Sequence, residues 1–304
     1  MLEPAQLYQV DADAVALDAP ALVVALDGFV DAGNAARLAV AALLAGQKPR
    51  QVVRFDVDQL VDYRSRRPPL QFDTNRWVGY NAPELDVVAL DDTAGTPYLL
   101  LIGPEPDAQW ERFAAAVAQI VRRFDVRLVI GMNAIPMAVP HTRPIGVTAH
   151  GTRPELTEGH EAWFTTAEVP GSAASLIEFR LGEADLDAMG FAVHVPHYLA
   201  RTEYPQAARV LLDHVGLAAG LHLPTEALLK AAERSDAEIA EQVAGSEEVG
   251  QVVQALERQY DTVAAGRGER SAIGLGGELP SADELAAEVE RFLADREEED
   301  RSGS

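Results

Sequence analysis

Short apolar runs alternate with helical patterns along the first two thirds of the chain. ALVVAL at 21–26 is a continuous β-branched and aliphatic run, which is typical of a strand buried on both faces. Residues 31–46 then show the apolar period of a helix and end on a glycine. The same signals predict further strands at 51–58, 87–90, 97–103, 126–133 and 191–200, and further helices at 107–124 and 204–220. Because strands that alternate with helices are joined by right-handed crossovers, the pattern predicts an α/β fold with a mostly parallel sheet flanked by helices.

The pattern changes at Thr225, after which helical segments follow one another without strands. Residues 225–304 contain 20 acidic and 8 basic residues, a net charge of −12 out of −23 for the whole chain. A segment this acidic and this short of aromatic residues does not form a large core alone. We therefore expect an α/β core domain at 1–224, a helical extension at 225–265 that packs on the core or on another subunit, and a Gly-rich linker with a final acidic helix and tail at 266–304.

Composition narrows the classes of function. The net charge of −23 repels nucleic acid and anionic membranes, so neither is an expected partner. The chain contains no cysteine, which rules out disulfides, a thiolate nucleophile and a cysteine-bound zinc ion. The N-terminal MLEPAQLYQVDAD lacks the basic and apolar segments of a secretory signal, and no apolar stretch reaches the length of about 18 residues expected of a membrane helix. We expect a cytoplasmic protein.

The turn DGFVDAGNAA at 27–36 lies where a buried strand meets a helix, at the edge where open α/β sheets bind ligands. Asp31 is a good helix N-cap, and Gly28 and Gly33 have the spacing of the glycines in a P-loop. Asn34 stands where the P-loop has its lysine, so we reject nucleotide triphosphate hydrolysis. Capping and tight packing account for the turn, and ligand binding is the alternative.

The sequence contains no convincing set of metal ligands and no convincing nucleophile. His194 and His197 are three residues apart on a predicted strand, so their side chains point to opposite faces and do not share an ion. The segment GSAAS at 171–175 is superficially similar to a nucleophile elbow, but its serines are off the central position. We therefore predict no metal site, no cofactor and no catalytic residue.

The stretch DVDQLVDYRSRRPPLQFDTNRW at 56–77 combines four arginines with aromatic rings and acids. Its two consecutive prolines stiffen the backbone, which makes a rigid recognition loop one interpretation. The other interpretation is that Arg64, Arg66 and Arg67 pair with nearby acidic residues.

A second stiff segment, MNAIPMAVPHTRPIGVTAHG at 132–151, follows a predicted strand. Its three closely spaced prolines lower the entropy cost of holding one shape. The small apolar residues between the prolines require burial, and the cationic His141 and Arg143 follow them. A loop that is stiff, apolar and cationic suits an interface better than exposed catalysis, so we expect the 132–151 segment to hold a shape at a subunit or partner surface.

Three motifs in order resemble the actinobacterial branch of the proteasome assembly chaperone 2 family: GFVDAGNAA at 28–36, YRSRRPP at 63–69 and IPMAVPHTRP at 135–144. The resemblance spans about residues 15–220, and the acidic helical end is similar to the extension that bacterial members carry. It implies an α/β fold similar to that of purine nucleoside phosphorylases and self-association as a trimer. For eukaryotic relatives, the family resemblance implies a role in the assembly of proteasome α-rings.

Two hypotheses of function follow. The first is a non-enzymatic, homo-oligomeric binding or assembly protein whose partners are itself and proteasome subunits. The second is a nucleoside- or anion-binding protein, or a phosphorylase- or hydrolase-like enzyme, that uses a cleft between the turn at 28–34 and the loop at 135–144. The candidate ligand- or partner-binding residues are Asp31, Gly33, Asn34, Arg66, Pro140, His141, Thr142 and Arg143.

Overall fold

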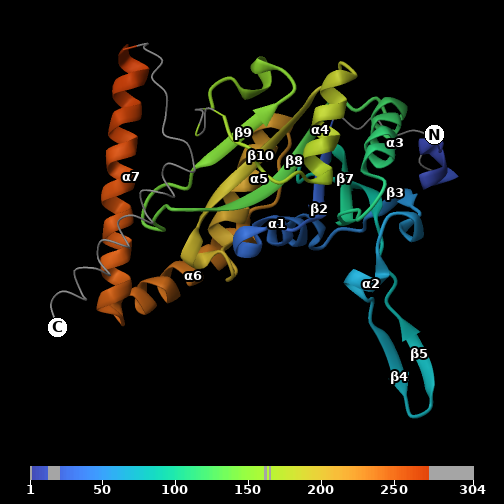
Figure 1. The fold of residues 1–304 in the computed structure, drawn as a ribbon, viewed down its shortest axis with the longest axis horizontal. Coiled ribbons are helices and arrows are strands. Elements are labelled where there is room, and N and C mark those ends of the chain that lie inside the picture. Colours follow the sequence, from blue (N-terminus) through green and yellow to red (C-terminus); the bar gives the residue numbers. More distant parts are fainter. Residues whose placement is uncertain (1, 13–20, 161–162, 164–165, 274–304) are drawn as a thin grey trace.

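An eight-stranded sheet forms the centre of the molecule (Figure 1). The computed structural model describes residues 2–12, 21–160, 163 and 166–273. From one edge to the other, the strands are β1 (Tyr8–Val10), β3 (Arg50–Phe55), β6 (Asp86–Asp91), β7 (Pro97–Pro104), β2 (Ala21–Asp27), β8 (Leu128–Met137), β10 (Ala188–Pro196) and β9 (Val147–Gly151). The central neighbours β7, β2, β8 and β10 run parallel, and the outer pairs are antiparallel. The predicted α/β fold with a large sheet flanked by helices is confirmed, and the sheet is mixed, with its parallel strands at the centre.

Helices cover both faces of this sheet. On one face lie α3 (Trp110–Arg123) and α4 (Ala173–Glu183), and on the other lie α1 (Ala35–Leu44) and α5 (Pro205–Ala219). Side chains alternate between the two cores along β2, where Leu22 packs toward α3 and α4 and Val23 packs toward α1 and α5. Every residue of β10 is buried, as expected for a strand of a sheet that is covered on both sides.

Two extensions leave this core at separate places (Figure 1). The first consists of the short helix α2 (Tyr63–Arg66) and a two-stranded sheet of β4 (Leu70–Asp73) and β5 (Arg76–Tyr80). We call residues 63–81 the arm, and Figure 1 shows it projecting away from the body. The second is the helical extension, formed by α6 (Glu226–Ala244) and α7 (Glu247–Ile273).

Strand β8 is longer than predicted. The apolar run indicated a strand ending at Asn133, but β8 continues to Met137. Its neighbour β2 pairs with it only as far as Gly131, whereas β10 pairs with it to Met137. Pro136 therefore lies where β8 has a neighbouring strand on one side only, and a proline is tolerated there because no second ladder needs its missing N–H.

Other elements were absent from the predicted pattern. They are β1, β9, α4 and the hairpin of the arm, which are short or only partly buried. Helix α7 continues to Ile273, past residue 266, where the sequence suggested the start of a linker. Each glycine in this stretch costs a helix only about 1 kcal/mol relative to alanine, and a long helix tolerates that. The final acidic helix and tail expected beyond it lie outside the described residues. No helix in the described ranges has both the length and the apolar composition required to cross a membrane.

Candidate functional site

The turn between β2 and α1 is shaped by capping and close packing. The Asp31 carboxylate accepts hydrogen bonds from the N–H groups of Ala36 at 2.8 Å and Arg37 at 3.1 Å, and so caps α1. Gly33 has a positive φ of 65°, and a Cβ there would lie 2.8 Å from the Cβ of Tyr204. Only glycine fits this close approach. Gly33 also exchanges backbone hydrogen bonds with the connection at 197–204, which follows β10. The structural interpretation of this turn therefore accounts for its glycine and its aspartate.

A cavity of about 530 Å³ opens beside this turn, between α1 and the ends of β2 and β7. Its apolar part is formed by aliphatic side chains such as Val40 and Ile102. Its charged lining consists of Asp27, Asp31, Glu84, Asp86 and Arg37, and Asn34 completes the polar rim. No residue of the loop at 135–144 belongs to this lining, so this cavity is not the cleft expected between that loop and the 28–34 turn.

The carboxylates of this cavity are only partly neutralised. Arg54 pairs with Asp86 at 2.8 Å and with Glu84 at 3.2 Å, and Arg37 pairs outward with Glu203 at 2.8 Å. Burial raises the pKa of Asp27, and the neighbouring charge of Asp31 raises it further. Burial also raises the pKa of Asp31, against the lowering effect of the N–H groups that it caps. A site with this electrostatic balance favours a cation over the anion that we considered from sequence.

The loop at 138–146 contacts the helical extension of its own chain. The Arg143 guanidinium forms a bidentate pair with Asp261 of α7, at 2.8 and 2.7 Å, and also reaches Glu257 at 3.2 Å. Thr142 donates a hydrogen bond to Glu257 at 2.5 Å, and the Tyr260 hydroxyl donates to the carbonyl of Pro144 at 3.1 Å. The stiff loop thus acts as the platform on which α7 rests.

His141 is oriented by Tyr198, from the connection that follows β10. The Tyr198 hydroxyl accepts a hydrogen bond from the backbone N–H of His141 at 2.9 Å and lies 2.8 Å from Nδ1 of its ring. Burial lowers the pKa of His141 and raises that of Tyr198, so both are neutral near pH 7 and the hydroxyl can donate to Nδ1. The preceding Pro140 is buried. This pair holds the loop in place.

The remaining chemical candidates of the sequence are structural. His194 is buried with its ring against Trp163, and its Nε2 lies 2.8 Å from the Thr148 hydroxyl. Ser172 caps α4, because its hydroxyl accepts the Ser175 N–H at 3.0 Å. Among the described residues, no three acidic or histidine side chains are grouped so as to hold a metal ion.

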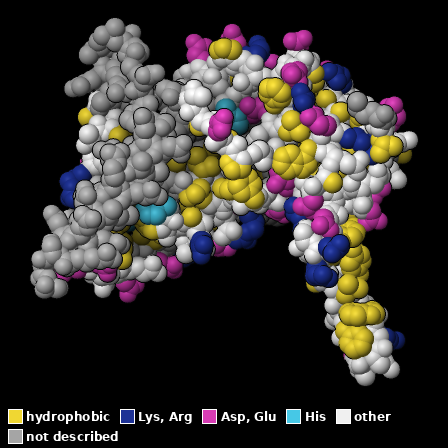
Figure 2. Space-filling view, in the orientation of Figure 1, with side chains coloured by type: hydrophobic (Ala, Val, Ile, Leu, Met, Phe, Trp, Pro, Cys, Tyr) yellow, Lys and Arg dark blue, Asp and Glu magenta, His cyan; other side chains and the backbone are white. Residues whose placement is uncertain are grey.

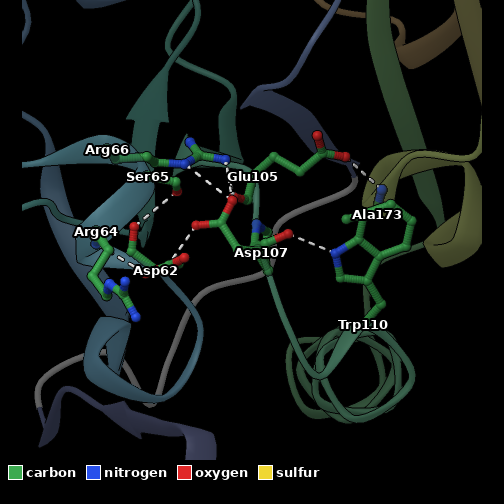
Figure 3. Close-up of polar contacts among 9 residues, drawn as sticks. Asp62, Arg64, Ser65, Arg66, Glu105, Asp107, Trp110 and Ala173 are labelled. Carbon is green, nitrogen blue, oxygen red and sulfur yellow. Dashed lines mark hydrogen bonds and ion pairs between the residues drawn. The ribbon is translucent and has the colours of Figure 1, made fainter.

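Arg66 anchors the root of the arm (Figure 3). Its guanidinium donates to the Asp107 carboxylate at 2.9 Å and to the Glu105 carbonyl at 2.7 Å. The other oxygen of Asp107 accepts the Asp62 N–H at 2.7 Å, just before α2. The Glu105 side chain is buried and accepts the Ala173 N–H at 2.6 Å, which links the root to α4 (Figure 3). The direction of the arm is therefore set by ion pairs and backbone contacts to the core.

The arm beyond this root carries an exposed apolar face. Leu70 pairs with Tyr80, and Phe72 pairs with Trp77, so their side chains lie on the same side of the hairpin. Phe72 and Trp77 stack edge to face at 4.9 Å but remain 56% and 65% exposed. Figure 2 shows these hydrophobic side chains as a continuous strip along the arm. Sequence reasoning missed this face, although apolar residues alternate on both sides of the turn at Thr74–Asn75.

The candidate residues thus occupy three places. Asp31, Gly33 and Asn34 form the turn beside the cavity, Arg66 holds the arm, and Pro140, His141, Thr142 and Arg143 support α7. The connection at 197–204 joins the first and the third places, because it bonds Gly33 on one side and His141 on the other. Of the features described above, the apolar face of the arm is the one that most lacks a packing partner.

Comparison with known proteins identifies a family whose sequence model matches this chain. The sequence model of the PAC2 family matches residues 25–243. Rv2714 of Mycobacterium tuberculosis, a protein of unknown function, is 46% identical, with a TM-score of 0.79 over 85% of this chain and 92% of its own. A Corynebacterium glutamicum protein of unknown function is 37% identical, with a TM-score of 0.80 over 84% of this chain and 97% of its own. The M. tuberculosis proteasome-assembly chaperone homologue Rv2125 is 26% identical, with a TM-score of 0.70 over 77% of this chain and 99% of its own. No curated protein matches the chain significantly.

Proposed function

The chain belongs to the PAC2 family, as its three motifs predicted, and from this premise we propose that it is a non-enzymatic assembly protein that acts as a homo-oligomer in the cytoplasm. A relative described as a proteasome-assembly chaperone homologue supports a chaperone-like role in assembly. The partners that we propose are other copies of the chain and proteasome subunits. The oligomer that we propose is the trimer implied by the family resemblance.

The observation that carries this proposal is the apolar face of the arm. A two-stranded hairpin with nothing packed against it is marginally stable in water. Leu70, Phe72, Trp77 and Tyr80 are each more than half exposed. Burying one side chain of this kind contributes about 1.5–3 kcal/mol. A partner surface that covers this face is therefore strongly favoured over an isolated chain.

The composition of the arm is also that of an interface. Interface cores are enriched in aromatic residues and arginine and depleted in lysine and acids. The arm contains four arginines and one acid, together with two tyrosines, one phenylalanine and one tryptophan. It also leaves the core as a rigidly anchored element, since Arg66 and Asp107 set its direction. A pre-oriented element loses less entropy when it binds.

A second candidate function is the binding of a small cationic ligand in the cavity beside Asp31. The cavity volume of about 530 Å³ supports this candidate, because small-molecule sites span roughly 300–1,000 Å³. Because the lining is acidic, the ligand that we propose is a cation, in place of the nucleoside or anion considered from the sequence. Calorimetry with spermidine and with arginine tests it, and saturable binding that is lost in an Asp27→Asn variant would support it.

The proposed assembly role has a direct test. Sedimentation equilibrium at micromolar concentration should give three times the chain mass of 32.7 kDa. Purified proteasome α-subunits should then bind the immobilised wild type. The Phe72→Ala/Trp77→Ala variant should sediment as a lighter species while keeping its circular dichroism spectrum. A wild type that sediments only at 32.7 kDa and binds no α-subunit would contradict the proposal.

A further inference from the structure

The arm and the acidic cavity have complementary chemistry, and both belong to the same chain. We propose that the arm of one copy seats in the cavity beside Asp27 and Asp31 of a second copy. This inference rests on the proposed self-association, and it names the surface that the arm contacts. It makes the cavity a socket between subunits.

Charge is the first argument. The arm has four arginines and one acid, a net charge of +3, in a chain whose total is −23. Arg64, Arg67 and Arg76 are exposed and form no ion pair with another described residue. The cavity is lined by four carboxylates; Glu84 and Asp86 pair with Arg54, while Asp27 and Asp31 form no ion pair with another described residue. The positively charged arm of one copy is therefore attracted to the acidic cavity of another copy.

Apolar surface is the second argument. The arm presents Phe72 and Trp77 on one face near its end, and Arg76, which pairs with Asp73, lies on the other face. The cavity offers aliphatic side chains, including Val40 and Ile102, below an acidic rim. At about 530 Å³ it lies in the size range of pockets that enclose drug-sized ligands, which is ample for an indole. Trp and Arg are also the residues most often found as binding hot spots.

The state of the cavity carboxylates is the third argument. Asp27 and Asp31 are close enough for one charge to raise the pKa of the other, and both are partly desolvated. An arriving arginine would offset this repulsion within a partly water-excluded site. Arg37 and Arg66 offset this repulsion only in part, because the pKa of Asp27 stays raised. The Arg37 guanidinium also pairs with Glu203 at 2.8 Å.

Geometry is the fourth argument. In Figure 1 the arm extends away from the body, so its end does not occupy the cavity of its own chain. The arm and the cavity are different surfaces, so each contact between copies is head-to-tail. Head-to-tail contacts that close by rotation produce a ring, and the proposed trimer is such a ring.

A mixing experiment tests the socket. One variant, Arg76→Glu/Trp77→Ala, has a defective arm and an intact cavity. The other, Asp27→Lys/Glu84→Lys, has an intact arm and a cavity of reversed charge, and both of its changes are at exposed residues. Val40→Trp fills the cavity from α1 and replaces the second variant if that one does not fold. A matched control, Glu233→Lys/Glu238→Lys, makes the same change of charge on the exposed side of α6.

Each defective variant alone should associate at least about 30-fold more weakly than wild type, which is the effect of losing one interface hot spot. Mixed in equal amounts, the two should form a complex of two chains and no larger species, because one functional contact remains. The control should assemble as wild type.

If the cavity variants assemble normally while the arm variant does not, the arm docks elsewhere and the socket is wrong, although self-association stands. If cavity variants lose only the binding of proteasome α-subunits, the cavity takes a foreign partner and the socket is again wrong. Normal assembly of the arm variant would overturn both proposals.

Discussion

The arm and the loop at 138–146 are both stiff, cationic and partly apolar, yet among the described residues only the loop meets its counterpart within the chain. Arg143 of the loop is paired with Asp261 and Glu257 of α7. The arm is also paired at its root, through Arg66, but Phe72 and Trp77 beyond the root remain 56% and 65% exposed. The loop therefore supports the fold of its own subunit, and the arm is free to contact another molecule.

This difference shows what a segment rich in proline and arginine does and does not predict. Prolines and arginines mark a segment whose shape and charge matter, but they do not say which surface meets it. The acidic helical extension provides the counterpart of the loop, because α7 stands beside the core where the loop reaches it (Figure 1). The alternating aromatic residues of the arm are the better sign of a contact between molecules, because a hairpin alone cannot bury them.

Removing the aromatic anchors of the arm should have the largest effect. The Phe72→Ala/Trp77→Ala variant removes two candidate hot spots, each worth about 2 kcal/mol, so association should weaken about 1,000-fold. Both side chains are exposed in the single chain, so the free energy of unfolding of the monomer should change by less than about 0.5 kcal/mol. Sedimentation velocity over a concentration series measures the first quantity and urea unfolding the second. A loss of monomer stability with unchanged association would reverse the roles that we assign to the arm.

The Gly33→Ala substitution should lower the free energy of unfolding more than the loss of any single ion pair would. Gly33 packs against the connection at 197–204, which also holds the loop in place. The new Cβ would meet Tyr204 at 2.8 Å in a backbone conformation with φ of 65°. Overpacking and the positive φ together should lower the free energy of unfolding by about 2–4 kcal/mol. Gly46→Ala is the matched control, because Gly46 has φ of 71° with nothing within 4 Å. Urea unfolding should show a loss of only about 1–2 kcal/mol for the control, and equal losses would contradict the close packing at Gly33.

The loop should also respond to pH through His141. Burial lowers the pKa of this imidazole below its usual value of about 6.5, so the unfolded chain binds more protons than the folded chain between the two values. The contribution of His141 to stability is therefore complete above about pH 6.5 and is lost as the pH falls below that value. Thermal unfolding between pH 7.5 and pH 5.5 should show a smaller drop in Tm for His141→Gln than for wild type. Identical pH profiles would show that His141 is not the titrating group.

The smallest effect is expected for Arg143→Ala. Its guanidinium is 31% exposed and its main partner Asp261 is 54% exposed, so solvent screens the pair. The free energy of unfolding should fall only slightly, because an ion pair screened by solvent contributes little to stability. Hydrogen exchange of α7 should become faster, while the oligomeric mass stays the same. A loss of assembly in this variant would return the loop to the role of a subunit interface.

Much of the core could be predicted because its signals are local. β2 and β7 are continuous apolar runs, and their burial on both faces makes the run itself the signal. β9 and β1 were missed because an edge strand is short and mixes buried with exposed positions. The end of β8 was misjudged because Pro136 is acceptable there only through the way β2 and β10 pair around it.

The candidate site was predicted less well, since contacts between distant residues decide it. Asp31 and Gly33 were assigned to capping and packing, which their contacts in the structure support. The partner of Arg143 is 118 residues away, and no spacing in the sequence identifies it. The hairpin of the arm consists of two strands of four and five residues, too short for their alternation to stand out.

The most direct test of the account compares hydrogen exchange in the arm and in the loop as the protein is diluted through its assembly range. The amides of residues 70–80 should be protected at high concentration and should exchange rapidly once the copies separate, because an isolated hairpin opens easily. The amides of residues 140–147 should keep the same protection throughout, since α7 of the same chain covers the loop. Arm protection that does not change with concentration, or loop protection that falls on dilution, would contradict the claim that the arm is the contact between molecules.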